Sequence, residues 1–344
     1  MKIQHQFPLY YSLFLLFLAT ITTLVSPSLG ALGKCHPSDY KALMNIKKSL
    51  NNPYHLASWK PNTDCCEWYV VKCDRKTNRI NELTVFQGEI SGQIPSSVGD
   101  LPYLETITFR HLTNVTGTIP QSITKLKNLY SLDLTYLSLS GPVPNFLNQL
   151  TKLKYLDLSF NQFSGSIPPN LSELKYLEAI HLDRNRLTGS IPESFGRFPG
   201  PVIPHLFLSH NQLSGPIPKS LGALDYGTID LSRNRFTGDA SMLFNAKHSL
   251  TSYIDLSRNQ FSFDLTNVKF PKSLTWLDLN HNKIFGRIPE EIKGLELQLL
   301  NVSYNSLCGK IPYGGKMQSF HSTDYFHNKC LCGSPMTACK KPNA

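Results

Sequence analysis

The chain has 344 residues, a formal net charge of +10 and eight cysteines. After residue 30 no apolar stretch is long enough to span a membrane, so we predict that the mature protein has no membrane anchor. The motifs Gly-x-Ser-x-Gly and His-Glu-x-x-His and a phosphate-binding loop are missing, which argues against the enzyme classes that carry them.

Residues 1–30 have the features of a secretory signal peptide. A weakly basic start is followed by an apolar run from Tyr10 to Val25 and by Ser28-Leu29-Gly30, a small-x-small cleavage pattern. A membrane anchor is the alternative, but threonines interrupt the apolar run. We expect a secreted, extracellular protein. Its positive charge would attract polyanions, and outside a cell these are acidic polysaccharides more often than nucleic acid.

The cysteines predict disulfides at both ends of the fold. One group is Cys35, Cys65, Cys66 and Cys73, and the other is Cys308, Cys330, Cys332 and Cys339. Cys330-x-Cys332 lacks the spacing of a zinc site, so we expect neither a metal nor a cofactor. Each group allows three pairings, and a bond between adjacent Cys65 and Cys66 would be strained. We expect the pairs Cys35–Cys65, Cys66–Cys73, Cys308–Cys330 and Cys332–Cys339.

Residues 31–78 are predicted to form an N-terminal cap. Pro37-Ser38-Asp39 resembles the start of a helix, and Ala42, Leu43, Ile46 and Leu50 then fall at helical spacing. Trp59 and Trp68 flank the adjacent cysteines, and we expect both to pack onto the first repeat.

Residues 79–315 contain a pattern that recurs about every 24 residues, the signature of a leucine-rich repeat. One copy reads Leu153, Leu156, Leu158, Asn161, Phe163, Gly165, Ile167, Pro168. We predict a right-handed α/β solenoid of ten repeats, with a parallel sheet on the concave face and short helical or 3-10 turns on the convex side. Residues 316–344 would form a C-terminal cap. Irregular coils are expected near residues 199–201, 238–241 and 263–265, where the pattern weakens or carries an insertion.

The concave face is expected to bind rather than to catalyse. Aspartates recur in its central column, and paired carboxylates occur in glycosidases. Asp in Leu-Asp-Leu-Ser is, however, the ordinary filler of this repeat, and an open sheet has no pocket to exclude water. Tyr155, Phe207, Tyr253 and Trp276 should face solvent, and such aromatic residues are enriched at protein interfaces.

Both caps and the Gly-x-Ile-Pro element of the repeats resemble one plant family. The segments that carry the likeness are Asp64-Cys65-Cys66-Glu67-Trp68, Leu307-Cys308-Gly309-Lys310-Ile311-Pro312 and Asn328-Lys329-Cys330-Leu331-Cys332-Gly333. With ten repeats and no membrane anchor, the whole mature chain is similar to the polygalacturonase-inhibiting proteins of plant cell walls. The resemblance implies a non-enzymatic protein that binds fungal, and possibly insect, endo-polygalacturonases and also pectin (homogalacturonan).

The resemblance also implies two sets of contact residues. Enzyme contacts would lie on the concave strands, at Tyr155, Asp157, Ala179, His181, His205, Phe207, Asp230, Tyr253, Asp255, Trp276 and Asp278. Pectin contacts would include the basic residues just before each repeat Asn, namely Arg184, His210, Arg233, Arg258 and His281. The two histidines would gain charge as the pH falls through ~6.5.

Two other functions remain open. One is a soluble co-receptor or peptide-binding protein in plant signalling, and the other is an ice-binding relative, although ice binding would favour flat uncharged Thr and Asn rows. We expect a monomer, with N-glycosylation sequons at Asn114, Asn170 and Asn301. Asn301 falls in a strand motif, so we expect it to be less accessible than the other two.

Overall fold

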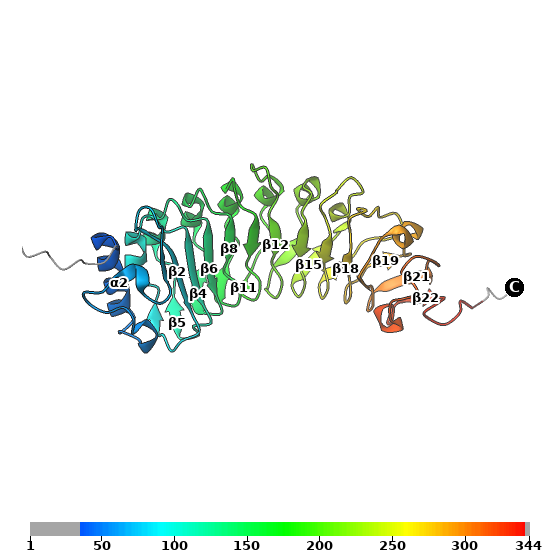
Figure 1. Ribbon diagram of the computed structural model, residues 1–344. Helices are drawn as coiled ribbons and strands as arrows, with labels where there is room; N and C mark the ends of the chain where they lie inside the picture. Colours follow the sequence, from blue (N-terminus) through cyan, green and yellow to red (C-terminus); the bar gives the residue numbers. More distant parts are fainter. Residues whose placement is uncertain (1–34, 341–344) are drawn as a thin grey trace, which may run out of the picture.

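The computed structural model describes residues 35–340, and the chain winds into a curved solenoid (Figure 1). The predicted signal peptide lies outside the described residues. The domain limits at residues 30, 78 and 315 stay predictions. The leucine-rich-repeat fold with ten repeat strands and disulfide-linked ends is confirmed.

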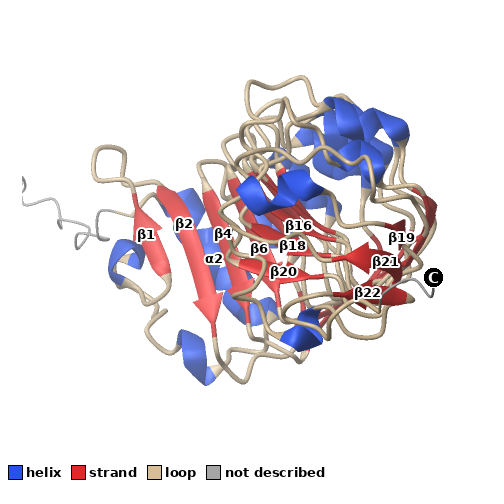
Figure 2. Ribbon diagram, turned by 90° about the vertical axis from the view of Figure 1, so that its right-hand side faces the viewer, coloured by secondary structure: helices blue, strands red, loops and turns tan. Residues whose placement is uncertain are grey.

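An eleven-stranded sheet lines the concave side of the described chain. Its first strand runs antiparallel to the second, and all later neighbours are parallel. Figure 2 shows β1, β2, β4 and β6 side by side. The strands, in spatial order, are β1 (Val71–Cys73), β2 (Ile80–Phe86), β4 (Thr106–Arg110), β6 (Ser131–Thr135), β8 (Tyr155–Asp157), β10 (Ala179–His181), β12 (His205–Phe207), β14 (Thr228–Asp230), β16 (Tyr253–Asp255), β18 (Trp276–Asp278) and β20 (Leu299–Asn301).

Shorter strands form three smaller sheets on the flank of the solenoid. They comprise β3 (Gly92–Gln93), β5 (Val115–Gly117), β7 (Ser138–Pro142), β9 (Gln162–Gly165) and β11 (Arg186–Leu187), then β13 (Ser214–Pro216), β15 (Arg235–Gly238) and β17 (Gln260–Phe261), then β19 (Phe285–Gly286), β21 (Ser306–Lys310) and β22 (Cys330–Cys332). The breaks between these sheets coincide with the insertion near 199–201 and with the weak motif at 263–265, where irregular coils were expected.

The convex side carries the predicted 3-10 turns. In the repeats these are η3 (Ser96–Asp100), η4 (Gln121–Lys125), η5 (Asn145–Gln149), η6 (Pro169–Glu173), η7 (Glu193–Gly196), η8 (Lys219–Ala223), η9 (Ser241–Leu243) and η10 (Glu290–Gly294). Most begin directly after the Pro of Gly-x-Ile-Pro, whose fixed φ suits the residue before a helical turn.

The core is one continuous stack of apolar side chains between these layers. In a typical coil Leu153, Leu156, Leu158, Phe163 and Ile167 are almost fully buried. From Asn161 onward a ladder of asparagines closes the bends beside the core. Asn161 Nδ2 donates to the carbonyls of Leu134 (2.6 Å) and Leu158 (3.2 Å), and its Oδ1 accepts from the Leu139 N–H (3.1 Å). These asparagines therefore satisfy buried backbone groups of neighbouring coils.

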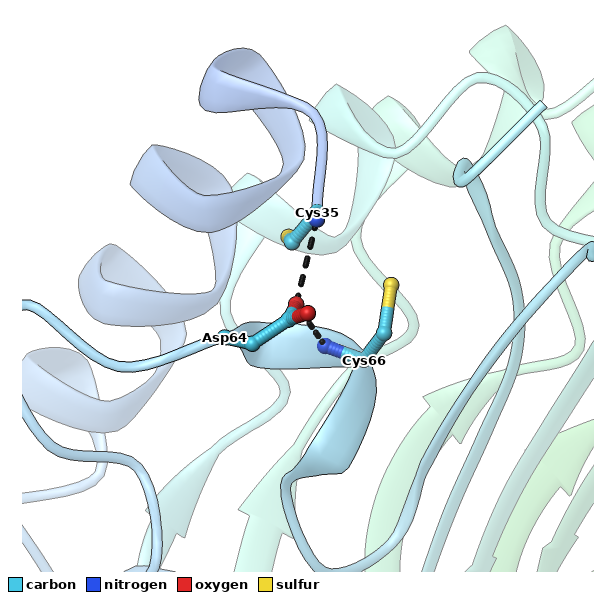
Figure 3. A group of neighbouring side chains, drawn as sticks. All are labelled: Cys35, Asp64 and Cys66. Carbon is cyan, nitrogen blue, oxygen red and sulfur yellow. Dashed lines mark hydrogen bonds between the residues drawn. The ribbon is translucent and has the colours of Figure 1, made fainter. Parts of the chain in front are cut away.

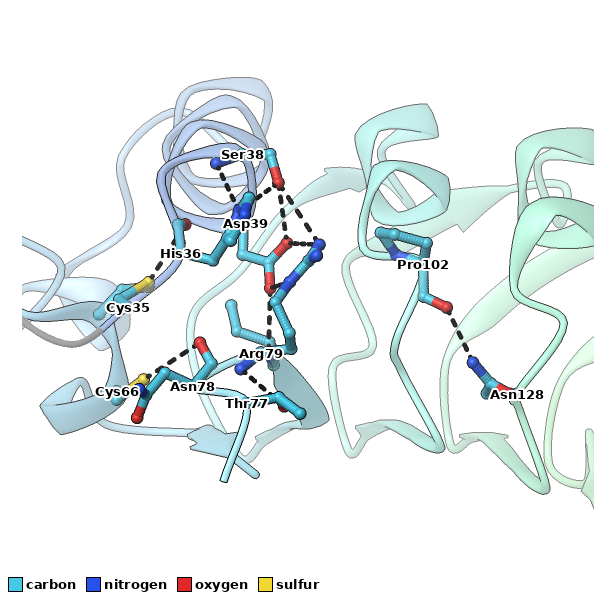
Figure 4. A network of polar contacts seen from close by, with 12 residues as sticks. Cys35, His36, Ser38, Asp39, Cys66, Thr77, Asn78, Arg79, Pro102 and Asn128 are labelled. Carbon is cyan, nitrogen blue, oxygen red and sulfur yellow. Dashed lines mark hydrogen bonds and ion pairs between the residues drawn. A yellow bond between two sulfur atoms is a disulfide. The ribbon is translucent and has the colours of Figure 1, made fainter. Parts of the chain in front are cut away.

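The N-terminal cap covers the first coil with helix α2 (Pro37–Ser49) and two 3-10 turns, η1 (Tyr54–Leu56) and η2 (Cys65–Glu67). Ala42, Leu43 and Ile46 of α2 are buried, and Trp59 stacks on Trp68 with 5.6 Å between ring centroids. Buried Asp39 pairs with Arg79 at 2.7 Å and accepts from the Ile80 N–H at 3.0 Å (Figure 4). This contact ties α2 to the start of β2.

The disulfides join Cys35 to Cys65, Cys66 to Cys73, Cys308 to Cys330 and Cys332 to Cys339, which are the pairs expected from the sequence. Cys35, Asp64 and Cys66 lie close together (Figure 3). Both sulfurs are committed to disulfides, and Asp64 Oδ1 accepts from the N–H groups of Cys35 (3.1 Å) and Cys66 (3.0 Å). The cluster therefore holds the cap together and offers no thiolate to a metal.

The C-terminal cap continues the solenoid instead of ending it. It includes η11 (Ser322–Asp324), and β22 pairs in parallel with β21. Asn328 donates to the Val302 carbonyl (2.9 Å) and accepts from the Leu307 N–H (3.0 Å), so the asparagine ladder extends beyond residue 315. Buried Tyr325 fills the position of a core leucine and donates its hydroxyl to the Met317 carbonyl (2.8 Å).

Candidate binding surface

The concave strands present their first and third residues to solvent, because side chains alternate along a strand. Tyr155 is 44% exposed and His205 is exposed. Ala179 lies between them in the sheet register but is only 8% exposed, so it adds little contact surface. The other predicted positions are half-buried: Asp157, His181, Phe207, Asp230, Tyr253, Asp255, Trp276 and Asp278.

Aromatic side chains on this face stack across neighbouring strands. His181 stacks on Phe207 with 4.1 Å between centroids, and Tyr253 stacks on Trp276 at 5.2 Å. Trp276 Nε1 has no hydrogen-bond partner within the described structure. Of the aromatics expected to face solvent, Phe207, Tyr253 and Trp276 thus leave only part of their rings open to a partner, while Tyr155 is the most exposed.

The aspartates of the central column have a structural role at the strand ends. Asp157 accepts from the Ser159 N–H at 3.0 Å, Asp230 from Ser232 at 3.0 Å and Asp255 from Ser257 at 2.9 Å. Each carboxylate thereby fixes the backbone that turns after the strand, as Asp commonly does. This repeated contact accounts for the Leu-Asp-Leu-Ser pattern without any catalytic role.

Three of these carboxylates lie in register on adjacent strands: Asp230, Asp255 and Asp278. Burial raises the pKa of Asp255 to about 7, and the carboxylates of Asp278 and Asp230 add to the shift. Burial likewise raises the pKa of Asp278. The middle of the concave face therefore loses negative charge in mildly acidic solution.

Along one edge of the sheet runs a column of residues with left-handed backbone conformation, here called the edge column. Each member except His327 follows a concave strand, and the φ of all members lies between 47° and 55°. The members are Gln87, His111, Tyr136, Phe160, Arg184, His210, Arg233, Arg258, His281, Tyr304 and His327. The five predicted basic residues form its centre and lie on successive coils, as the repeat spacing requires.

Aromatic stacks extend the edge column on both sides of the basic centre. Tyr136 stacks between His111 (4.2 Å) and Phe160 (3.8 Å), and the Arg184 guanidinium lies 4.8 Å from the Phe160 ring centroid. At the other end Tyr304 stacks between His281 (4.0 Å) and His327 (4.2 Å). Sequence reasoning missed His111 and Tyr136 because Leu112 and Leu137 take the place of the following Asn. It missed Phe160 and Tyr304, which do precede an Asn, because it selected only basic residues of the repeats.

The two basic-centre histidines titrate below the pH that the sequence suggested. Burial lowers the pKa of His210, and the positive charges of Arg184 and Arg233 lower it further. Burial and Arg258 lower the pKa of His281 in the same way. In the free protein these rings therefore become charged at a lower pH than an ordinary histidine.

Known proteins resemble this chain in its N-terminal cap, in its repeats and over nearly its full length. The family described as "Leucine rich repeat N-terminal domain" matches residues 36–74, and "Leucine Rich Repeat" matches residues 152–174, 176–198, 204–224 and 273–295. The chain is 63% identical to Polygalacturonase inhibitor 1 of Arabidopsis thaliana over 332 residues, 96% of this chain and 98% of that one. It is 62% identical to the Polygalacturonase inhibitor of Vitis vinifera over 325 residues, 94% of this chain and 96% of that one.

The chain belongs to the polygalacturonase-inhibitor family. The resemblance recognised from its caps and repeats is thus confirmed. A solved structure described as a plant ice-binding protein is also similar, with a TM-score of 0.87 and 51% identity, covering 90% of this chain and 99% of that chain. Proteins with this fold and this degree of identity to the chain are therefore described either as polygalacturonase inhibitors or as an ice-binding protein. The surface residues of this chain have to distinguish the two functions.

The three sequons of this polygalacturonase-inhibitor family member differ in their surroundings. Asn114 is exposed. Asn170 is half-buried and its Nδ2 donates to the Asn145 carbonyl at 2.9 Å. Asn301 lies in β20, where its Oδ1 accepts from both the N–H (3.0 Å) and the hydroxyl (2.7 Å) of Ser303. Glycosylation stays a prediction, and Asn114 has the most accessible amide.

Between residues 35 and 340, none of the helices has the length and apolar character needed to cross a membrane.

Proposed function

We propose that this protein is a secreted, non-enzymatic inhibitor of endo-polygalacturonases, those of fungi in particular, with insect enzymes as a second class of target. The observation that carries the proposal is its 62–63% identity, over nearly the whole chain, to relatives named as polygalacturonase inhibitors. The four disulfides suit an oxidising extracellular compartment, which agrees with a place in the plant cell wall.

The concave face supplies the chemistry that such a contact needs. It combines an exposed tyrosine, the Tyr253–Trp276 and His181–Phe207 stacks, and the Asp230, Asp255 and Asp278 row. Tyr and Trp are enriched among interface hot spots, and fixed carboxylates favour a partner surface that carries cations. The inhibitor would act as a monomer, with the curved sheet as its contact surface.

The direct test is inhibition of a panel of purified fungal endo-polygalacturonases, measured by release of reducing ends from polygalacturonate. The expected result is inhibition of at least one enzyme, with no hydrolysis by the inhibitor alone. A folded protein that leaves every enzyme of a broad panel uninhibited would remove this proposal and favour a signalling role, as a co-receptor or peptide-binding protein.

The edge column gives the proposal a second part, retention of the protein on pectin. The basic centre of the column lies on five successive coils, in the order Arg184, His210, Arg233, Arg258 and His281. With strands ~4.8 Å apart, five coils extend roughly 20 Å, enough for several units of a polygalacturonate chain. Retention on immobilised polygalacturonate tests this part independently of enzyme inhibition.

Ice binding is the second candidate, because of the 51% identical structure described as a plant ice-binding protein. The concave rows of this chain carry aspartates, histidines and stacked aromatics rather than flat uncharged Thr and Asn rows. An assay of ice recrystallisation with the purified protein separates the two candidates, and we expect no effect beyond that of a non-binding control protein.

A further inference from the structure

A shallow pocket lies at the edge of the concave sheet opposite the edge column. Its volume is about 680 Å³, within the ~300–1,000 Å³ range of small-ligand sites. Tyr130, Lys152 and Tyr176 contribute to its lining, and they lie just before β6, β8 and β10. Parallel strands all begin at one edge, which brings these residues together. The pocket is open to solvent, so it agrees with the expectation that this sheet has no pocket that excludes water.

Three tyrosines give the pocket its apolar surface. Tyr130, Tyr155 and Tyr176 are 40%, 44% and 46% exposed. The rings of the edge column cover one another at 3.8–4.2 Å. The pocket tyrosines instead keep nearly half their surface in solvent. Lys175 Nζ lies over the Tyr176 ring at 5.5 Å from its centroid, and the other exposed ring surfaces remain available to a ligand with an apolar face of its own.

Polar groups around the tyrosines are already held in place. Lys154 Nζ donates to Glu178 Oε1 at 2.8 Å, and the Tyr155 hydroxyl donates to Glu178 Oε2 at 2.6 Å. Lys152 Nζ donates to Asn128 Oδ1 at 2.8 Å, and Asn128 Nδ2 donates to the Pro102 carbonyl at 3.3 Å (Figure 4). Glu178 neutralises Lys154, and Glu105 in the lining offsets the charge that Lys152 keeps beside the neutral Asn128 amide. The pocket therefore favours a neutral, hydroxyl-bearing ligand over a polyanion.

The backbone at this edge is not open to an extended peptide. The Glu105 carbonyl accepts from the N–H groups of Tyr130 (2.9 Å) and Ser131 (3.1 Å). The Tyr130 carbonyl accepts in turn from Lys154 (2.8 Å) and Tyr155 (3.0 Å). A peptide added as a strand depends on free main-chain groups, so recognition here must come from side chains.

We propose that this pocket binds a neutral hexose oligosaccharide. The C–H face of a pyranose ring would pack on the half-exposed tyrosine rings, and its hydroxyls would bond to Lys152, Asn128 and Glu105. This ligand differs in charge from the polyanion assigned to the edge column, and the site lies at the opposite edge of the sheet. The proposal goes beyond polygalacturonase inhibition and does not depend on it.

Three probes test the proposal and distinguish the sources of such a sugar. Cellohexaose and linear β-1,4-galactohexaose represent wall glycans, and free high-mannose glycan represents glycans carried by proteins. Saturation-transfer NMR on the full mature protein should show binding of at least one probe at millimolar concentration. Tyr130→Ala and Tyr176→Ala should each weaken that binding by roughly tenfold, as expected for loss of a well-packed aromatic contact.

Tyr313→Ala is the matched control, because Tyr313 is 75% exposed and lies outside the pocket lining. It should bind the probe like the unmodified protein. Circular dichroism checks that each variant is folded, and polygalacturonate retention should be unchanged in all three. The proposal is overturned if no probe binds, or if a bound probe is equally affected by all three variants. Loss of enzyme inhibition without any sugar binding would assign the pocket to the protein interface and also overturn it.

Discussion

Asp255→Asn should stabilise the folded protein at neutral pH and have almost no effect in acid. Asp255 lies in register between the carboxylates of Asp230 and Asp278, and burial raises its pKa to about 7. In the unfolded chain the value is ~3.9. Between these two pKa values the folded state therefore binds more protons than the unfolded state. The stability that the Asp255 carboxyl contributes is fully present below pH ~4 and is lost as the pH rises through about 7.

The size of the effect follows from the same shift. About three pKa units at ~1.36 kcal/mol each set a ceiling of ~4 kcal/mol. The Asp255 side chain is only half-buried, so solvent screening reduces this figure, and we expect a gain of about 1–2 kcal/mol at pH 8. Asn keeps the side-chain oxygen that accepts from the Ser257 N–H, so the turn after β16 should be preserved.

The measurement is denaturant unfolding of both proteins at pH 4 and pH 8 with the disulfides intact. Asp157→Asn is the matched control: Asp157 makes the same contact to the Ser159 N–H, but its register neighbours are Asp133 and His181 instead of two aspartates. A gain for Asp255→Asn that is equal at both pH values, or matched by Asp157→Asn, would refute the argument that repulsion and burial of this carboxylate cost stability.

Three further predictions concern the concave face, the edge column and the asparagine ladder. Phe207→Ala and Trp276→Ala should each weaken polygalacturonase inhibition by ~2 kcal/mol or more if they are hot spots, with unchanged circular dichroism; wild-type inhibition by both would place the interface elsewhere. The triple change of Arg184, Arg233 and Arg258 to Gln should abolish retention on polygalacturonate while much of the inhibition remains, and Gln87 already adopts the same left-handed conformation in this chain. The charge-matched control changes Arg186, Arg235 and Arg287, which are exposed and outside the column, and equal loss of retention in both would show a non-specific charge effect. Asn234→Ala should lower the unfolding free energy by roughly 2–4 kcal/mol, because it leaves the Leu208 and Leu231 carbonyls and the Leu213 N–H without their buried partner; a loss below 1 kcal/mol, roughly the worth of one hydrogen bond, would contradict that reasoning.

The fold could be predicted because its information is local and repeated. Leu153, Leu156 and Leu158 set one coil, and each later coil repeats the same spacing, so a single interpretation fixes the sheet, the core and the bends. The C-terminal boundary was harder to predict. Asn328 continues the ladder, but Tyr325 stands where most coils have a leucine, so the last coil does not match the leucine pattern.

The surface could be predicted only where it follows the repeat. The sequence located the basic centre of the edge column but not the stacks of Tyr136 and Tyr304, since stacking depends on the curvature that brings rings together. It also located the concave strand residues but not the pocket. Tyr130 and Tyr176 precede their strands and occupy different repeat positions, so no single column of the sequence joins them.

Acid should strengthen pectin binding by the edge column and weaken enzyme binding by the concave face. As the pH falls from 8 to 5, Asp255 loses its negative charge first, because burial and two neighbouring aspartates raise its pKa to about 7. His210 and His281 gain positive charge later, because burial lowers the pKa of each. Both changes make the protein more positive, which strengthens attraction to ionised pectin and weakens any contact between the concave carboxylates and a cationic partner surface. A bound polygalacturonate chain favours the charged imidazoles, so linkage requires pectin to raise the pKa of both histidines towards or above their ordinary value.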